Sequence, residues 1–314
     1  MRIVPARKLQ LTNQPVLMEG AVVERIRRAA GPQLHTALMN APLIYDPAGR
    51  AALERIYQEY IDIALAAGLN LWLCTPTWRA NRERLQGSAF PDSINQDAAR
   101  FMCSLRDKQG QAAEQISIGG LIGCRHDCYQ PSEGLDSTSA FDFHSWQIAN
   151  LAEGGVDFLI AQTLPALPEA LGIARSMART QLPYIISFVI NRQGLLLDGS
   201  RLSAAVRQID EQVDRPPLGY AVNCAWPGFL SAEDMDPELR QRLIGFMANA
   251  SDLDHCELDG CSELQTQDAA VWADLMLQLY RQQGLRVLGG CCGTDGSHLS
   301  RLAALLSPGA VAEA

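Results

Sequence analysis

Eight short apolar runs alternate along this chain with stretches of helical periodicity, and that alternation limits the folds open to the chain. The runs cover residues 15–19, 70–75, 115–120, 156–163, 183–190, 219–224, 243–249 and 285–290. Apolar residues follow one another in these runs almost without interruption. Such runs are typical of strands that are covered on both faces, as in a parallel sheet.

Helices are expected between the runs, at residues 51–68, 92–107, 139–153, 165–179, 200–213, 265–283 and 296–306. In the first of them Leu53, Ile56, Tyr57 and Tyr60 recur every three or four residues, which places them on one face, and Gly68 ends the helix. The repeated strand-then-helix order predicts a single-domain (β/α)8 barrel of the TIM type over residues 1–314. A doubly wound open sheet is the alternative, because eight strands do not by themselves require closure.

Composition narrows the class of protein. The net charge of -9 argues against nucleic acid as a partner, because phosphate binding needs a basic face. No apolar run approaches the roughly 20 residues of a membrane span, and no apolar segment follows the basic N-terminal residues. Nine cysteines, an odd number, favour reduced thiols over a disulfide framework. We therefore expect a cytoplasmic enzyme without a membrane partner.

Three cysteines lie where a barrel gathers its functional residues, at the carboxyl ends of strands. Cys224 closes the sixth run, while Cys291 and Cys292 follow directly after the eighth. In a barrel only the seventh strand separates the sixth from the eighth, so the three thiols are expected to converge. Three protein ligands with one open position are typical of a catalytic zinc site. Inert core cysteines are the alternative, but the surrounding "GGCCG" favours a special backbone geometry.

At these cysteines the chain resembles the homocysteine S-methyltransferase family. The resemblance rests on "VNC" at the sixth run and "GGCCGT" at the eighth, with weaker support from "LMEGAVVERI" and "YIDIALAAGLNLWLCTPTWRA". It implies that Cys224, Cys291 and Cys292 bind Zn2+ and that the fold is the barrel. The implied reaction moves a methyl group from an onium-type donor to a thiol, by default to homocysteine, which gives methionine.

The implied substrate-binding residues include two departures from the family pattern. Glu19 stands where the family has aspartate, and Gln162 stands where it has a carboxylate. Both acidic groups of the family hold the ammonium of homocysteine, so the neutral amide removes a charge-assisted contact of about 1.5–3 kcal/mol. The full set that the resemblance implies is Glu19, Thr75, Trp78, Gln162 and Asn223.

The expected partners are small molecules, a thiol and a methyl donor, and the sequence leaves a homo-oligomer open. Two other functions also stay open: a diverged enzyme that acts on another thiol or methylated substrate, and a non-catalytic zinc-binding barrel. The loop after the seventh run carries Cys256, Cys261 and several carboxylates, among them Asp259, and is expected to be a solvated face with ordinary thiols.

Overall fold

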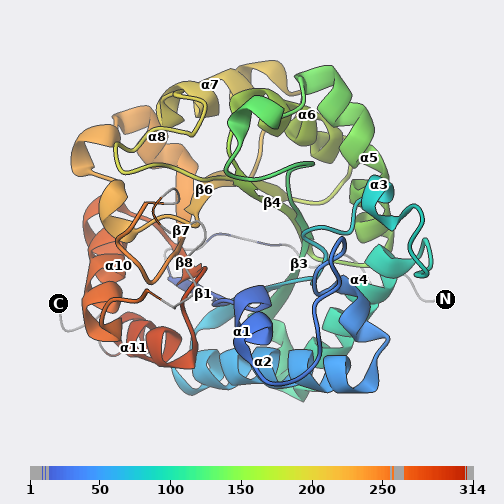
Figure 1. Cartoon of the computed structure of the whole chain (residues 1–314). Helices are drawn as coiled ribbons and strands as arrows, with labels where there is room; N and C mark the ends of the chain where they lie inside the picture. The colour runs from blue at the N-terminus through green and yellow to red at the C-terminus, as the bar shows by residue number, and fades with distance from the viewer. Residues whose placement is uncertain are drawn as a thin grey trace.

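The strands close into one parallel barrel in chain order, from β1 to β8, and β8 pairs back onto β1 (Figure 1). A computed structural model describes residues 9, 11, 14–254, 257, 265–307 and 309. Each strand overlaps one predicted run, and the closure of the sheet confirms the single-domain barrel and shows that the open sheet was wrong. The strands are β1 Val16–Met18, β2 Asn70–Cys74, β3 Ile116–Ile122, β4 Phe158–Leu164, β5 Tyr184–Phe188, β6 Gly219–Asn223, β7 Leu243–Ala248 and β8 Val287–Gly290.

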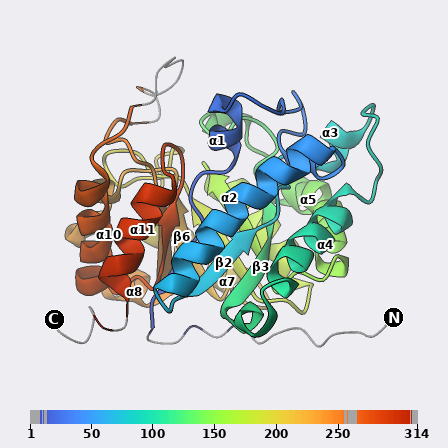
Figure 2. The same ribbon diagram turned by 90° about the horizontal axis from the view of Figure 1, so that it is seen from below.

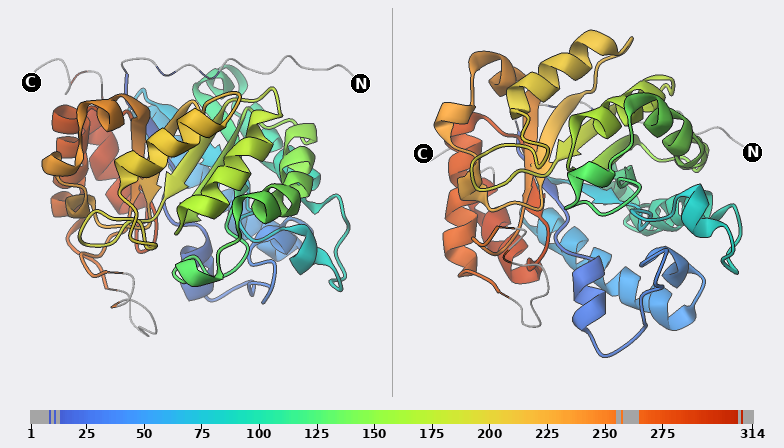
Figure 3. Two further views of the ribbon diagram at one scale, coloured as in Figure 1. Left: turned by 90° about the horizontal axis from the view of Figure 1, so that it is seen from above. Right: turned by 45° about the horizontal axis from the view of Figure 1, so that its top comes forward.

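Helices surround the sheet on its outer face (Figures 1 and 3). Those that match the predicted stretches are α2 Pro47–Ala66, α4 Ile94–Asp107, α5 Ser137–Glu153, α6 Leu167–Ala178, α7 Leu202–Gln212, α10 Ala269–Gln283 and α11 Gly296–Leu306. Within the described ranges the helices that the periodicity did not reveal are α1 Val23–Arg28, α3 Arg82–Leu85 and α8 Pro237–Arg242. They are too short to show an amphipathic repeat. Short 3-10 segments lie at Ala41–Ile44, Gly110–Gln115, Pro131–Glu133, Pro227–Phe229 and Ala232–Asp234.

Large side chains fill the interior of the barrel. Trp72 of β2 and Phe158 of β4 pack with their ring centroids 4.9 Å apart. Gly119 of β3 makes room for this pair, because a Cβ there would lie 2.6 Å from the Phe158 ring. A second apolar layer, built mainly from Leu, Ile, Val and Ala, lies between the strands and the helices. The barrel is therefore a packed core rather than a pore, and open space is left to its ends.

The loops at the carboxyl ends of the strands form the functional face. α1 and α3 lie above this end of the barrel, and the loop between β3 and α5 lies beside them (Figure 2). Cys256, Cys261 and Asp259 fall outside the described residues. Among the helices that are described, none is both long and apolar enough to span a membrane. That the domain extends over the whole range 1–314 stays a prediction.

Candidate active site and metal centre

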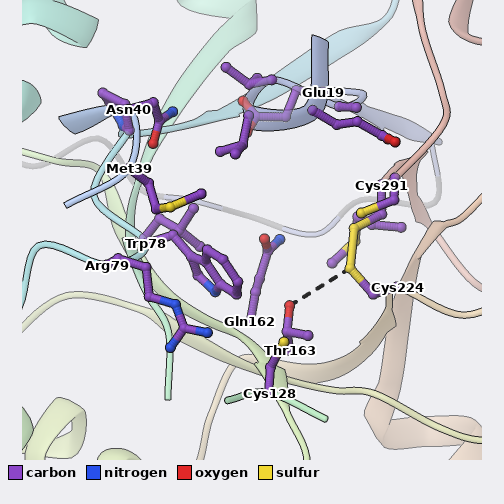
Figure 4. A pocket seen from close by; sticks show the side chains of 18 of the residues that line it. Glu19, Met39, Asn40, Trp78, Arg79, Cys128, Gln162, Thr163, Cys224 and Cys291 are labelled. Atoms are coloured by element: carbon purple, nitrogen blue, oxygen red, sulfur yellow. Dashed lines mark hydrogen bonds between the residues drawn. A yellow bond between two sulfur atoms is a disulfide. The ribbon is translucent and has the colours of Figure 1, made fainter. Parts of the chain in front are cut away.

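A cavity of about 560 Å³ opens at the carboxyl ends of the strands. Its wall combines apolar side chains with a few polar and charged groups, as small-molecule sites usually do. Of the sequence-predicted site residues, the cavity is lined by Glu19, Thr75, Trp78, Gln162, Cys224, Cys291 and Cys292 (Figure 4). Asn223 is the exception, since it does not line the cavity.

The three cysteines converge as the strand order requires. Cys224 follows β6, and Cys291 and Cys292 follow β8. Their sulfur atoms all lie within 4.8 Å of one another. Among the residues that the structure describes, no other group of three His, Cys, Asp or Glu side chains comes this close together. The arrangement therefore provides three ligand atoms at one point on the cavity wall.

Backbone hydrogen bonds fix the double cysteine. The amide of Cys291 donates to the carbonyl of Ala248 at 2.7 Å, and the carbonyl of Cys292 accepts from the amide of Ala250 at 2.9 Å. Gly293 then takes a φ of +81°, a left-handed conformation that glycine adopts without steric cost. The hydroxyl of Thr294 donates back to the carbonyl of Cys291 at 2.7 Å. The glycines of the motif thus shape a tight turn that presents both thiols.

Cys224 is held by a polar network behind the cavity. The hydroxyl of Thr163 lies 3.8 Å from the Cys224 sulfur as a donor. Asn223 accepts from the Thr163 amide at 2.8 Å and from the Ser187 hydroxyl at 2.7 Å, and it donates to the Thr163 hydroxyl at 2.7 Å. Both the oxygen and the nitrogen of its amide group are therefore engaged inside the protein. We expect Asn223 to position Cys224, and its contact with the substrate stays a prediction.

Two residues at this part of the site have an unusual backbone conformation. Thr163 has a φ of 61° and Cys224 a φ of 53°, both in the left-handed region that is costly for residues with a Cβ. Such outliers persist where the surrounding contacts fix them, and they gather at functional sites. Sequence alone could not identify Thr163 as a site residue, because a threonine within an apolar strand normally indicates packing.

The donor set fits a soft metal ion. Thiolate sulfurs are the ligands that zinc and other thiophilic metals prefer, and three of them leave a fourth position free. In this structure the Cys224 and Cys291 sulfurs are joined as a disulfide. Cys292 is a free, solvent-exposed thiol on the cavity wall. Because metal ligands must be reduced and deprotonated, the site would bind its ion in the reduced state.

Glu19 brings a carboxyl group into the cavity. One of its oxygens accepts a hydrogen bond from the Cys74 amide at 2.7 Å. Desolvation inside the cavity raises its pKa to about 8, although the hydrogen bond from Cys74 opposes the shift. A cationic group bound next to it would favour the ionised form. Glu19 is therefore suited to receive an ammonium group.

The remaining predicted residues occupy distinct positions. The hydroxyl of Thr75 accepts from the Leu121 amide at 2.9 Å and also bonds the Thr77 hydroxyl at 2.7 Å, which ties β2 to β3. The side chain of Gln162 is half-buried and points into the cavity (Figure 4). Trp78 also lines the cavity, with its indole against Gly123.

Replacing Glu19 with glutamine is expected to change how stability depends on pH. In the folded protein Glu19 keeps its proton up to about pH 8, whereas in the unfolded chain it loses the proton near its ordinary value of 4.5. The contribution of Glu19 to the free energy of unfolding is therefore fully present below about pH 4.5 and is lost as pH rises towards 8. Glutamine keeps the hydrogen-bond acceptor but does not titrate.

We therefore expect the Tm of reduced, metal-free Glu19→Gln protein to gain a few degrees on that of the wild type between pH 5 and pH 8.5. Thermal unfolding followed by circular dichroism at four or five pH values measures this gap. A gap that stays constant across the range contradicts the raised pKa.

The chain is similar in sequence to known methyltransferases. A family model described as homocysteine S-methyltransferase matches residues 16–306. The chain is 23% identical over 322 residues to homocysteine S-methyltransferase YbgG of Bacillus subtilis, covering 96% of this chain and 97% of that relative. It is also 23% identical to methionine synthase of Mycobacterium tuberculosis, over 81% of this chain but 21% of that relative.

Solved structures agree on the fold. The homocysteine methyltransferase MmuM of Escherichia coli matches with a TM-score of 0.68 in its metallated form and 0.71 in its oxidized form. Each match is 18% identical and covers 93% of this chain and 96% of that chain. These similarities support the single-domain barrel.

Proposed function

The chain belongs to the homocysteine S-methyltransferase family and is an enzyme of methyl transfer to homocysteine; from that premise we propose that it is zinc-dependent and takes the methyl group from a free onium donor. One observation carries the proposal for the metal: three cysteine sulfurs within 4.8 Å of one another on the wall of the cavity. Cys224, Cys291 and Cys292 would hold the ion.

Zinc suits this site because its donor set is all sulfur and one position stays open. When bound, zinc would lower the pKa of a thiol in the open position so that the thiolate forms near neutral pH. The protein supplies the placement. Thr163 and Asn223 fix Cys224, and the turn at Gly293 fixes Cys291 and Cys292.

The acceptor's amino group is proposed to bind at Glu19. The carboxylate of Glu19 compensates the ammonium charge, and the side-chain oxygen of Gln162 accepts a further hydrogen bond from the same group. Glu19 would lose its proton when the ammonium binds, because a nearby cation favours the ionised form. These two residues orient the thiol chain towards the cysteines.

The donor needs no proton from the protein. The acceptor sulfur forms a bond to the methyl carbon while the bond between that carbon and the onium atom breaks. The electron pair stays on the donor's sulfur or nitrogen, which becomes neutral, so no general acid is required. The protein contributes position and exclusion of water.

Methyl transfer tests this proposal directly. Reduced, zinc-loaded protein is incubated with homocysteine and S-adenosylmethionine, S-methylmethionine or betaine, and the product is identified by mass. We expect methionine with at least one donor, and loss of activity on chelation that zinc restores. Full activity in zinc-free protein would refute the proposed mechanism.

The substitution Gln162→Glu is expected to tighten homocysteine binding about tenfold, or ~1.4 kcal/mol. The amide accepts a hydrogen bond from an ammonium but adds no charge, whereas a carboxylate adds both. Isothermal titration of the reduced, zinc-loaded protein measures the change. As a control, a thiol of similar length without the amino group should gain nothing.

The same titration decides about a diverged acceptor. An acceptor thiol without an ammonium group is the second candidate, because Gln162 leaves Glu19 as the single carboxylate among the predicted acceptor contacts. If the wild type binds the amine-free thiol more tightly than homocysteine, the acceptor has diverged. Unchanged homocysteine affinity in Gln162→Glu shows that position 162 does not contact the ammonium group.

A further inference from the structure

Three arginines line the cavity, and two of them, Arg79 and Arg84, are largely withdrawn from solvent without a carboxylate partner, whereas Arg27 is exposed. Arg79 follows β2 and is 8% exposed, and Arg84 lies half-buried on α3. Both line the cavity. Neither forms an ion pair with a carboxylate of the described residues. Buried arginines are normally paired, because their guanidinium groups stay charged throughout the physiological pH range.

Their hydrogen bonds go to neutral groups. Arg79 donates through Nη1 to the carbonyl of Cys124 at 2.9 Å and to the carbonyl of His126. Arg84 donates to the carbonyls of Ala37 and Arg125, each at 3.3 Å. Nε and Nη2 of Arg79 make no hydrogen bond with the part of the chain that the structure describes. Carbonyl oxygens satisfy some of the N–H groups but carry no net charge, and Glu83, whose charge partly offsets the lowering of the Arg84 pKa by burial, bonds Arg125 instead.

The two charges also act on each other. Burial and the nearby Arg79 guanidinium lower the pKa of Arg84. Arg125, whose carbonyl accepts from Arg84, shows the opposite situation. It pairs with Glu83 through two bonds of 2.9 and 3.0 Å, which raise its pKa, and it does not line the cavity. An anion in the cavity would give Arg79 and Arg84 the partner that Arg125 already has.

The wall around them is rigidly held. The Arg79 guanidinium lies over the Trp78 ring at 4.1 Å, which fixes its plane. The neighbouring loop is anchored by buried Glu169, which accepts from the Arg125 amide at 2.8 Å and bonds His144 Nε2 at 2.9 Å. The N–H groups are therefore presented without the cost of ordering flexible side chains.

Arg79 stands apart from the three cysteines. In the view of the cavity, Arg79 lies on the opposite side from Cys224 and Cys291, with Trp78 between them (Figure 4). Besides Glu19, two carboxylates line the cavity: Glu24 pairs with Arg28 at 3.1 Å and accepts from the Gly293 amide, and the exposed Asp127 accepts from the Tyr129 amide. The side of the cavity remote from the cysteines therefore offers unpaired positive charge.

We propose that Arg79 and Arg84 form an anion subsite that binds a carboxylate or phosphate group of the methyl donor. This inference rests on the proposed function for the identity of the ligand as the donor. The acceptor occupies the side of Glu19 and the cysteines, so the donor's anionic end faces the arginines and its onium methyl group points towards the acceptor sulfur. The donor class is an onium compound that also carries an anionic group.

Binding measurements test the subsite without turnover. Glycine betaine, dimethylsulfoniopropionate, their neutralised carboxamide forms and inorganic phosphate are titrated calorimetrically into reduced, zinc-loaded protein. We expect Arg84→Gln to weaken binding of an acid donor about tenfold. Arg125→Gln, which removes an equal charge from a paired arginine, should leave it unchanged. The carboxamide should bind equally to wild type and Arg84→Gln.

Each outcome decides. Binding of phosphate but of neither acid donor, weakened in Arg84→Gln, identifies the anionic group as phosphate. Equal effects of Arg84→Gln and Arg125→Gln, or no preference of the wild type for acid over carboxamide, overturn the subsite. If Arg84→Gln does not fold, the preference of the wild type for acid over carboxamide still tests the subsite. Anion binding that depends on Arg84 in a protein without methyl transfer would keep the subsite and refute the proposed function. Methyl transfer with equal KM for the acid donor and its carboxamide would keep the proposed function and refute the subsite.

Discussion

Removing two of the proposed metal ligands together, by Cys291→Ala with Cys292→Ala, is expected to lower kcat/KM for homocysteine by about 10³-fold. Metal-ion catalysis contributes several kcal/mol, and ~4 kcal/mol corresponds to that factor. Without the ion the acceptor would react as a free thiol, of which only a few per cent is thiolate near pH 7. The initial rate of methionine formation under reducing conditions measures the loss.

The control for this prediction is Cys103→Ala. Cys103 lies on α4 and does not line the cavity, and its sulfur donates to the carbonyl of Gly155 at 3.5 Å. Its removal should leave kcat/KM within about twofold of the wild type, because the change lies outside the site. A double variant that keeps more than a tenth of wild-type activity would contradict the role assigned to the two cysteines.

Asn223→Ala is expected to weaken metal binding by about 10- to 100-fold, the usual effect of losing a group that orients a metal ligand. The substitution removes all three hydrogen bonds that connect Asn223 with Thr163 and Ser187. Thr163 would then no longer be held in its left-handed conformation beside the Cys224 sulfur. Competition with a chromophoric zinc chelator measures the affinity.

A matched control separates metal affinity from stability. Asn95 is also a fully buried amide, and it donates to the carbonyl of Ala80 at 2.8 Å without lining the cavity. Asn95→Ala should lower Tm but leave zinc affinity unchanged. If both variants lose the same zinc affinity, the effect comes from general destabilisation of the fold, and the proposal that Asn223 positions Cys224 is wrong.

The eight strands were predictable because a parallel barrel buries both faces of its strands and so leaves uninterrupted apolar runs. The convergence of Cys224 with Cys291 and Cys292 was also predictable, since strand order fixes which loops are neighbours. The short helices α1, α3 and α8 were not, because one or two turns show no periodicity.

The positions of Asn223, Arg79 and Arg84 could not be predicted from the sequence for a different reason. A polar residue at a strand end has the same pattern whether it faces the cavity or the neighbouring strand, so Asn223 was expected at the substrate. Arg79 and Arg84 lie in a loop and a short helix, where arginines are normally solvated. Their burial without a carboxylate arises only from the packing of the loop between β3 and α5 against them.

The metal content of the reduced protein tests the central claim most directly. Wild-type protein and the Cys291→Ala/Cys292→Ala variant are purified with a thiol reductant and without added metal, and zinc is measured by elemental analysis. We predict one zinc ion per chain in the wild type and less than about a tenth of that in the variant. Equal zinc in both proteins would contradict the assignment of Cys224, Cys291 and Cys292 as the metal centre.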